Sequence, residues 1–170
     1  MYKRRTNMKL FINEKMLSLN THLPIKKENG QDFLIIESKL ISIGKKKWIK
    51  DLKGNELAYI EEKLLNIMPT YEIYTNNELE CSISKKIAFF KKSYELSNGF
   101  KIEGDMIGMN FSIYNDEGTE IATVSRPIIS IGYRFEIDIT DENNYILILA
   151  IIVALITDVL AQEEKKENDN

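Results

Sequence analysis

Tyr145-Ile146-Leu147-Ile148-Leu149-Ala150-Ile151-Ile152-Val153-Ala154-Leu155-Ile156 is an uninterrupted apolar run near the end of the chain. A helix that is apolar on all sides either fills a protein interior or enters a membrane. The uncharged stretch between Glu142 and Asp158 spans about 22 Å as a helix, against roughly 30 Å of bilayer hydrocarbon. We therefore predict a buried helix at about 144–161 and no transmembrane span, with a tail anchor as the alternative.

The sequence before this run repeats with a period of roughly 24 residues, a length typical of repeated supersecondary units. The units begin at Lys15, Lys39, Lys63, Lys86, Glu103 and Pro127, and the shortest spacing lies just before Glu103. Each unit carries an aliphatic residue at the same offset, namely Ile25, Ile49, Ile73, Leu96, Ile113 or Ile137. The repetition indicates one structural element used several times.

Each repeat reads as a β-hairpin. Its middle carries a turn signal, as in Asn29-Gly30, Lys53-Gly54, Asn76-Asn77, Asn98-Gly99 and Glu117-Gly118. Asn and Gly tolerate the positive φ that tight hairpins require. Between turns the residues alternate, most clearly from Tyr133 to Ile139, where apolar and charged side chains take opposite faces.

The predicted fold is mainly β, with one helix. We expect a roughly twelve-stranded antiparallel closed barrel wrapped around the buried C-terminal hydrophobic helix. About eight strands enclose an interior that side chains can fill, whereas about twelve leave a wider space. The apolar helix would occupy that space.

The chain is predicted to form one domain. The barrel covers 8–161, residues 1–7 form a short basic N-terminal arm, and residues 162–170 form a disordered acidic tail. The net charge of −3 disfavours nucleic acid as a partner. Cys81 is the single cysteine, and the N-terminus lacks a secretory signal. We expect a cytoplasmic protein that is peripheral at the membrane if it binds lipid.

Several stretches together resemble the LURP-one-related family, a relative of the Tubby C-terminal domain and of phospholipid scramblases. They are Ile25–Gly30, Lys39–Gly44, Asp51–Glu56, Pro69–Tyr74, Glu103–Asp105 and the terminal apolar helix with Asp158. The resemblance implies a twelve-stranded barrel around a C-terminal helix. It also implies phosphoinositide binding on the barrel face, as in Tubby relatives, or action at membranes, as in scramblases. No catalytic motif comes with it.

The residues give little support for catalysis, metal binding or a cofactor. His22 is the only histidine and precedes a strand, and Cys81 alternates with apolar neighbours, which is typical of a core thiol. Glu103 and Asp105 bracket Gly104, a pattern that favours a bend or bulge over an acid–base pair. A zinc-binding set of His and Cys ligands and a phosphate-binding glycine loop are absent from the sequence. We expect Asp158 near a barrel mouth, solvated or bonded to backbone amides.

Lysine clusters are the candidate binding residues. Lys45, Lys46 and Lys47 form one cluster, and Lys91 with Lys92 forms another. If the fold gathers them, anionic headgroups would be attracted by about 1 kcal/mol per lysine near the surface. The alternative is a solvated lysine face that discourages edge pairing. The sequence therefore predicts a non-enzymatic binding protein for anionic membrane lipid. The alternatives are a protein-interaction scaffold and a scramblase-like membrane-associated protein.

Overall fold

The computed structural model describes residues 7–13, 22–40, 45–64, 68–88, 91–127 and 134–169. Within these ranges the chain forms twelve β-strands followed by helix α2 (Tyr145–Asn168). The strands are β1 (Met8–Asn13), β2 (His22–Lys27), β3 (Asp32–Leu40), β4 (Lys45–Lys50), β5 (Glu56–Lys63), β6 (Thr70–Thr75), β7 (Glu78–Ala88), β8 (Lys91–Leu96), β9 (Lys101–Asp105), β10 (Asn110–Tyr114), β11 (Glu120–Ser125) and β12 (Arg134–Ile139). The basic arm, apart from Asn7, lies outside the described residues.

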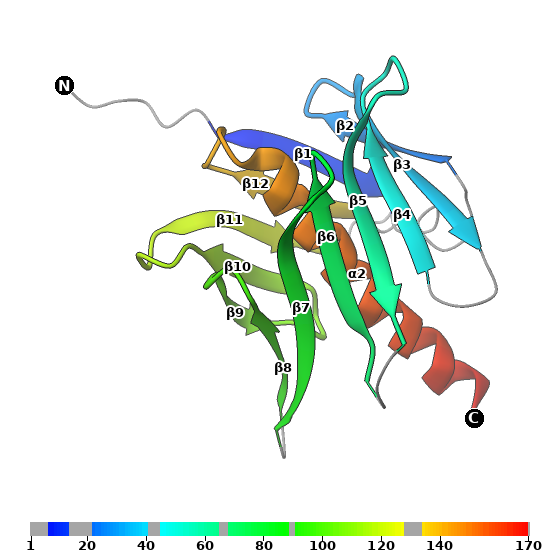
Figure 1. Ribbon diagram of the computed structural model, residues 1–170, viewed down its shortest axis with the longest axis vertical. Helices are drawn as coiled ribbons and strands as arrows, with labels where there is room; N and C mark the ends of the chain where they lie inside the picture. Colours follow the sequence, from blue (N-terminus) through cyan, green and yellow to red (C-terminus); the bar gives the residue numbers. More distant parts are fainter. Residues whose placement is uncertain are drawn as a thin grey trace.

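All the strand pairs are antiparallel and form one sheet, which curves around α2 (Figure 1). The sheet order is β8-β7-β6-β5-β4-β3-β2-β1-β12-β11-β10-β9. Strand β1 pairs with β12, so the two ends of the strand sequence meet, with Leu10 opposite Ile137. The predicted mainly β fold with twelve antiparallel strands and a C-terminal helix is confirmed.

The barrel is nearly closed rather than fully closed. Strands β8 and β9 are the two edges of the sheet and share no hydrogen-bonded ladder in the described residues. At the end of β8 the chain remains bonded to β7, since Ser97 N donates to the Ser82 carbonyl at 3.0 Å. Strand β9 is largely exposed, with Ile102 its one partly buried side chain. Little apolar surface is therefore available to join the two edges.

Turn residues confirm the hairpin reading. Gly54 has φ of +89°, and Asn76 and Asn77 have φ of 51° and 63°. These are left-handed backbone conformations, which glycine and asparagine adopt more readily than other residues. Several hairpins also carry a β-bulge shortly after the turn, as at Leu57, where Ile49 faces Ala58 but Lys50 faces Glu56. A bulge of this kind changes which side chains share a face.

Helix α2 fills the barrel, as its apolar sequence predicts (Figure 1). Residues from Ile148 to Val159 are buried, and the helix contacts β5, β6 and β7. Inward strand residues such as Ile49, Ile73 and Phe135 complete the core. Each fully buried aliphatic side chain contributes about 1.5–3 kcal/mol. By length and composition alone α2 could also cross a membrane, and 67% of its most apolar window is buried inside the barrel.

The helix continues to Asn168, beyond Ala161, where we expected it to end and a disordered tail to begin. The added residues are mainly Gln, Glu and Lys, which have high helix propensity. Glu163 is also bound to the barrel, since its Oε1 lies 3.2 Å from Nη1 of Arg126. Helix propensity and this contact together extend α2 past the barrel.

Candidate functional site

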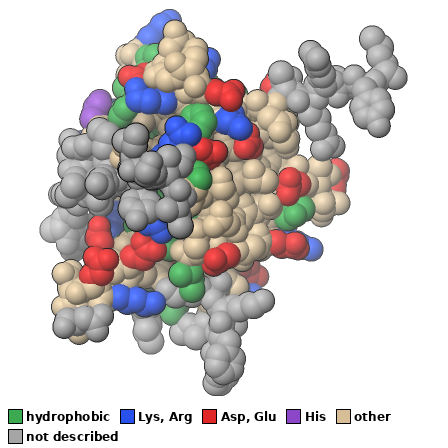
Figure 2. Space-filling model, turned by 180° about the vertical axis from the view of Figure 1, so that it is seen from behind, with side chains coloured by type: hydrophobic (Ala, Val, Ile, Leu, Met, Phe, Trp, Pro, Cys, Tyr) green, Lys and Arg blue, Asp and Glu red, His purple; other side chains and the backbone are tan. Residues whose placement is uncertain are grey.

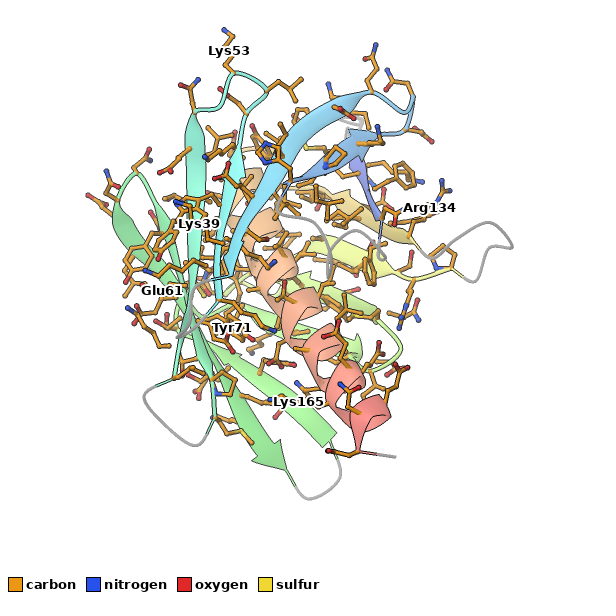
Figure 3. The ribbon with its side chains drawn as sticks, turned by 90° about the vertical axis from the view of Figure 1, so that its right-hand side faces the viewer. Lys39, Lys53, Glu61, Tyr71, Arg134 and Lys165 are labelled. Atoms are coloured by element: carbon orange, nitrogen blue, oxygen red, sulfur yellow. The ribbon has the colours of Figure 1, made fainter. Side chains whose placement is uncertain are left out.

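The exit mouth is the end of the barrel at which the C-terminal part of α2 leaves. Figure 3 shows Lys165 at this end and Lys53 at the opposite end. Inward positions are aliphatic in the middle of the barrel, as at Ile49 and Ile73. Two residues closer to the exit mouth the inward positions become polar. They include Ser38, Lys47, Glu62, Tyr71, Lys85 and Tyr94.

Asp158 is the central acceptor of this mouth. It lies on α2, is only 4% exposed, and receives hydrogen bonds from three strands and from one residue of its own helix. Tyr94 Oη donates to Oδ2 at 2.6 Å, and Tyr71 Oη donates to Oδ1 at 3.1 Å. Gln162 Nε2 donates to Oδ2 at 2.5 Å, and Lys85 Nζ lies 3.4 Å from the same oxygen. These contacts join the helix to β6, β7 and β8.

The tyrosine hydroxyls of this cluster stay protonated. Burial raises the pKa of Tyr71 well above its ordinary value, and the negative charge of Asp158 adds to the effect. The pKa of Tyr94 is raised by burial and by its hydrogen bond to Asp158. Both hydroxyls are therefore donors to a carboxylate. Asp158 lies near the mouth as expected, but its partners are side chains rather than solvent or backbone amides.

Lys47 is the unusual cation of the exit mouth. It is 6% exposed, and its Nζ donates to Ser38 Oγ at 2.8 Å. Within the described residues, no carboxylate forms an ion pair with it. Burial, with a smaller effect from the charge of Lys45, lowers the pKa of Lys47 to about 8. A buried ammonium group normally has a carboxylate or other anionic partner. Among the described residues, the partner of Lys47 is the Ser38 hydroxyl alone.

The two lysines beside Lys47 have different surroundings. Lys45 shares the inward phase of Lys47, and its backbone N–H donates to Glu62 Oε2 at 3.0 Å. Lys46 points outward and lies 3.5 Å from Glu61 Oε1. The triple lysine therefore alternates between the two faces of β4 instead of forming one outer patch.

Lys91 and Lys92 begin strand β8, opposite Ala88 and Ile87 of β7. Strands β8 and β4 are separated in the sheet by β7, β6 and β5. Both strands start at the exit mouth, so the two clusters share one end of the barrel but lie on separate strands. The Lys91 and Lys92 side chains fall outside the described residues.

Charges of both signs are interspersed on the described surface seen in Figure 2. Several lysines and arginines on the outer wall have carboxylate partners: Lys50 binds Glu37 at 2.9 Å and Lys63 binds Glu61 at 2.8 Å. The Lys63 hydrogen bond also lowers the pKa of Glu61. This pairing lowers the positive charge of the outer wall. Lys47 at the exit mouth differs from these outer lysines, because its described partner is a hydroxyl.

The residues weighed for catalysis lie apart from this mouth cluster or are inert. The His22 side chain is 64% exposed and lies 4.0 Å from Glu37. Cys81 is buried, which raises the pKa of its thiol. Asp105 accepts a hydrogen bond from the Gly108 backbone N–H at 2.9 Å in the turn after β9. Gly104 pairs with Phe111 without a bulge, so the expected bend or bulge is not found there. The described residues include no group of three His, Cys, Asp or Glu side chains suited to a metal ion.

Sequence reasoning missed Tyr71, Lys85 and Tyr94 as members of the mouth cluster. A signal for Lys85 was present, because it is in phase with the inward residues Cys81 and Ile83. Lys47 is likewise in phase with Ile49. A lysine at an inward position of a strand is unusual, since lysine is rarely buried without a partner.

Comparisons with known proteins find a matching family model and a relative in sequence. A family model described as LURP-one-related matches residues 8–156. The uncharacterized protein YxjI of Bacillus subtilis (strain 168) is 26% identical over 104 residues, which cover 61% of this chain and 62% of that protein. The match therefore spans less than two thirds of that relative.

An X-ray structure of an Arabidopsis thaliana protein resembles the fold, with a TM-score of 0.62 and 13% identity. The similarity covers 88% of this chain and 89% of the plant protein. At this identity the likeness concerns the barrel architecture alone.

Proposed function

The chain belongs to the LURP-one-related family, and from that premise and the exit mouth we propose that it is a non-enzymatic protein that binds anionic membrane lipid. The observation that carries the proposal is Lys47, a buried ammonium group whose partner is the Ser38 hydroxyl. A phosphate oxygen would supply the missing negative charge. Charge-assisted hydrogen bonds of this kind are shorter and stronger than neutral ones.

Lys45 adds a second cation in the same inward phase, two positions from Lys47 on β4. The nearby carboxylates have other partners: Asp158 is held by Lys85 and the tyrosines, and Glu62 accepts the Lys45 backbone N–H. Neither Lys45 nor Lys47 forms an ion pair with a described carboxylate, so a headgroup phosphate would meet two ammonium groups beside the Glu62 carboxylate.

The surroundings of the mouth favour a lipid over a free anion. Lys91 and Lys92 begin a second strand at this end. Lysines near a negatively charged membrane surface contribute about 1 kcal/mol each. The proposed location is the cytoplasmic surface of a membrane, with the barrel itself outside the bilayer.

Vesicle flotation tests the proposal. Vesicles of phosphatidylcholine, of phosphatidylcholine with phosphatidylserine, and of phosphatidylcholine with phosphoinositide would separate general charge from headgroup recognition. We expect binding to the anionic vesicles that weakens as salt is raised. A Lys45→Ala, Lys47→Ala variant should bind roughly 30-fold more weakly, from about 1 kcal/mol per lysine.

The matched control changes Lys26 and Lys27 to alanine at the opposite end of the barrel. Unchanged flotation of that control would assign the effect to the exit mouth. Equal loss in both variants would reduce the interaction to net charge, and no flotation on any vesicle would remove lipid binding and favour the protein-interaction scaffold. Ester and phosphoester substrates should show no turnover.

A further inference from the structure

A row of aromatic rings lies on the outer wall of the barrel, away from the exit mouth. Trp48, Tyr59 and Tyr74 face one another across β4, β5 and β6. The ring centroids of Trp48 and Tyr59 are 5.2 Å apart, and those of Tyr59 and Tyr74 are 5.8 Å apart. These rings line a groove of about 520 Å³ together with Glu56, Leu57 and Asn76. The volume lies in the range of small-molecule sites.

A bulge brings a carboxylate to this groove. Because Leu57 is the extra residue of β5, Glu56 faces Lys50 and shares its side of the sheet with Trp48. Glu56 is exposed and has no hydrogen bond or ion pair to any described residue. The ammonium group of Lys50 is 2.9 Å from Glu37, so it is already paired with a different carboxylate. Glu56 therefore offers a negative charge, without a partner among the described residues, beside the aromatic row.

The aromatic row already attracts a cation of the chain itself. Lys39 Nζ lies 5.5 Å from the centroid of the Trp48 ring, and Figure 3 shows Lys39 on this side of the barrel. Aromatic faces are negative and bind ammonium groups, and Trp binds them best. Tyr59 and Tyr74 extend the same chemistry along the groove, which Glu56 also lines.

We propose that this groove binds an organic cation carrying a quaternary or methylated ammonium group. Such a group is large, weakly hydrated and positively charged, so it can contact aromatic faces and a carboxylate at once. A neutral apolar ligand would leave Glu56 without a counter-charge, and an anion would be repelled by it. The site is separate from the exit mouth, and its ligand has the opposite charge.

The tryptophan provides a direct readout, since Trp48 is the only tryptophan of the chain. Titration with choline should change its fluorescence in a saturable way. Because the groove is exposed and each ring attracts a cation only weakly, we expect a dissociation constant in the millimolar range or weaker. The uncharged isostere, in which a tert-butyl group replaces trimethylammonium, should bind at least about fivefold more weakly. Equal binding of the isostere would overturn the proposal.

Two variants locate the site. Glu56→Gln removes the carboxylate charge and Tyr74→Leu removes one ring, and each should weaken choline binding by about two- to fivefold. Glu28→Gln, an exposed carboxylate in the turn after β2, is the matched control and should leave binding unchanged. Loss of binding in the control but not in the groove variants, or no saturable response of the full chain, would overturn the proposal.

A free cation and a lipid headgroup share this chemistry, and vesicles of pure phosphatidylcholine distinguish them. Vesicle binding that Tyr74→Leu removes, with choline also bound, supports a headgroup. Choline binding without vesicle binding supports a free small cation. Neither result should change in the Lys45→Ala, Lys47→Ala variant, because those lysines lie at the exit mouth.

Discussion

The Tyr94 hydroxyl lies 2.6 Å from Asp158 Oδ2 and so ties an edge strand of the sheet to the helix inside it. Strand β8 has a neighbouring strand on one side only, β7. Among the described residues, no backbone ladder holds the other edge of β8 in place. The side-chain bond to the central helix therefore stabilises the strand from within the barrel.

Tyr94→Phe should lower the free energy of unfolding by about 1.5–3 kcal/mol, the usual contribution of a hydrogen bond to a charged acceptor. Urea denaturation of the full chain measures it. Tyr114→Phe is the matched control, because its hydroxyl lies 3.3 Å from the exposed Glu120. Its effect should stay below about 0.5 kcal/mol. Equal effects of the two changes would show that Tyr94 contributes no special support.

Asp158→Ala should be more damaging than Tyr94→Phe. It leaves Lys85, whose side chain is 13% exposed, without its carboxylate, and two tyrosine hydroxyls without their acceptor. Breaking a buried pair from one side costs about 3–5 kcal/mol. The measurement is again urea unfolding, and a double variant with Lys85→Met should recover part of the loss. Absence of any recovery would contradict the ion-pair explanation.

Lys47→Met should stabilise the protein near neutral pH. The pKa of Lys47 is about 8 in the folded chain, below the roughly 10.4 of an unfolded lysine. Between these pH values the unfolded state binds the extra proton, so the free energy of unfolding rises with pH there and the penalty is complete below about pH 8. Removing the amine should add about 3 kcal/mol at pH 7.

The difference between the wild type and Lys47→Met should shrink as pH rises from about 7 to 9.5, since the wild type loses its penalty by deprotonation. Thermal unfolding at several pH values measures this. Lys53→Met, in an exposed turn at the opposite end of the barrel, should show no such trend. A constant difference across the range would contradict the assignment.

Gly104→Ala should destabilise the fold by at least about 2 kcal/mol. Gly104 has φ of +124°, and an added Cβ would lie 2.6 Å from the Asn110 carbonyl oxygen and 2.8 Å from Phe111 Cα. These are backbone atoms that cannot move aside cheaply. Gly54 has φ of +89°, and an added Cβ there would meet no atom within 4 Å. Gly54→Ala should therefore lower the free energy of unfolding by about 1 kcal/mol, from backbone strain alone. Comparable melting temperatures of the two variants would contradict this account.

Ile152→Ala should lower the free energy of unfolding by about 2–5 kcal/mol, because Ile152 of α2 is fully buried and its loss leaves a cavity. Ile107→Ala, at a residue that is 54% exposed, should have an effect within about 0.5 kcal/mol. Chemical denaturation measures both. A small effect at Ile152 would mean that the helix does not occupy the barrel in solution.

The barrel and its helix were predictable because their signals are local and repeated. Alternation and turn residues identify strands, and an apolar run surrounded by hairpins identifies a buried helix. The short repeat before Glu103 falls where the β8–β9 seam interrupts the sheet. The short repeat alone does not predict this interruption, which becomes visible only in the strand pairing of the sheet.

The mouth cluster was only partly predictable, since it depends on where strands lie around the barrel. Asp158 stood out as a charge after an apolar run, yet its partners Tyr71 and Tyr94 come from strands far away in sequence. Their inward phase can be counted along each strand, but their meeting with one helix residue requires the curvature of the sheet. The bulge that re-aims Glu56 is likewise invisible until the register is known.

The pairing of β1 with β12 has a consequence for the order of folding. Strand β1 obtains its second neighbour only after the eleven strands that follow it have been synthesised, and the space that the sheet surrounds is filled by a helix that follows them all. Contacts between such distant parts give a high contact order, which slows folding. A ribosome-bound chain in which α2 has not yet been synthesised would expose the apolar inner face of the sheet. Such a face is prone to aggregation, which chaperones prevent.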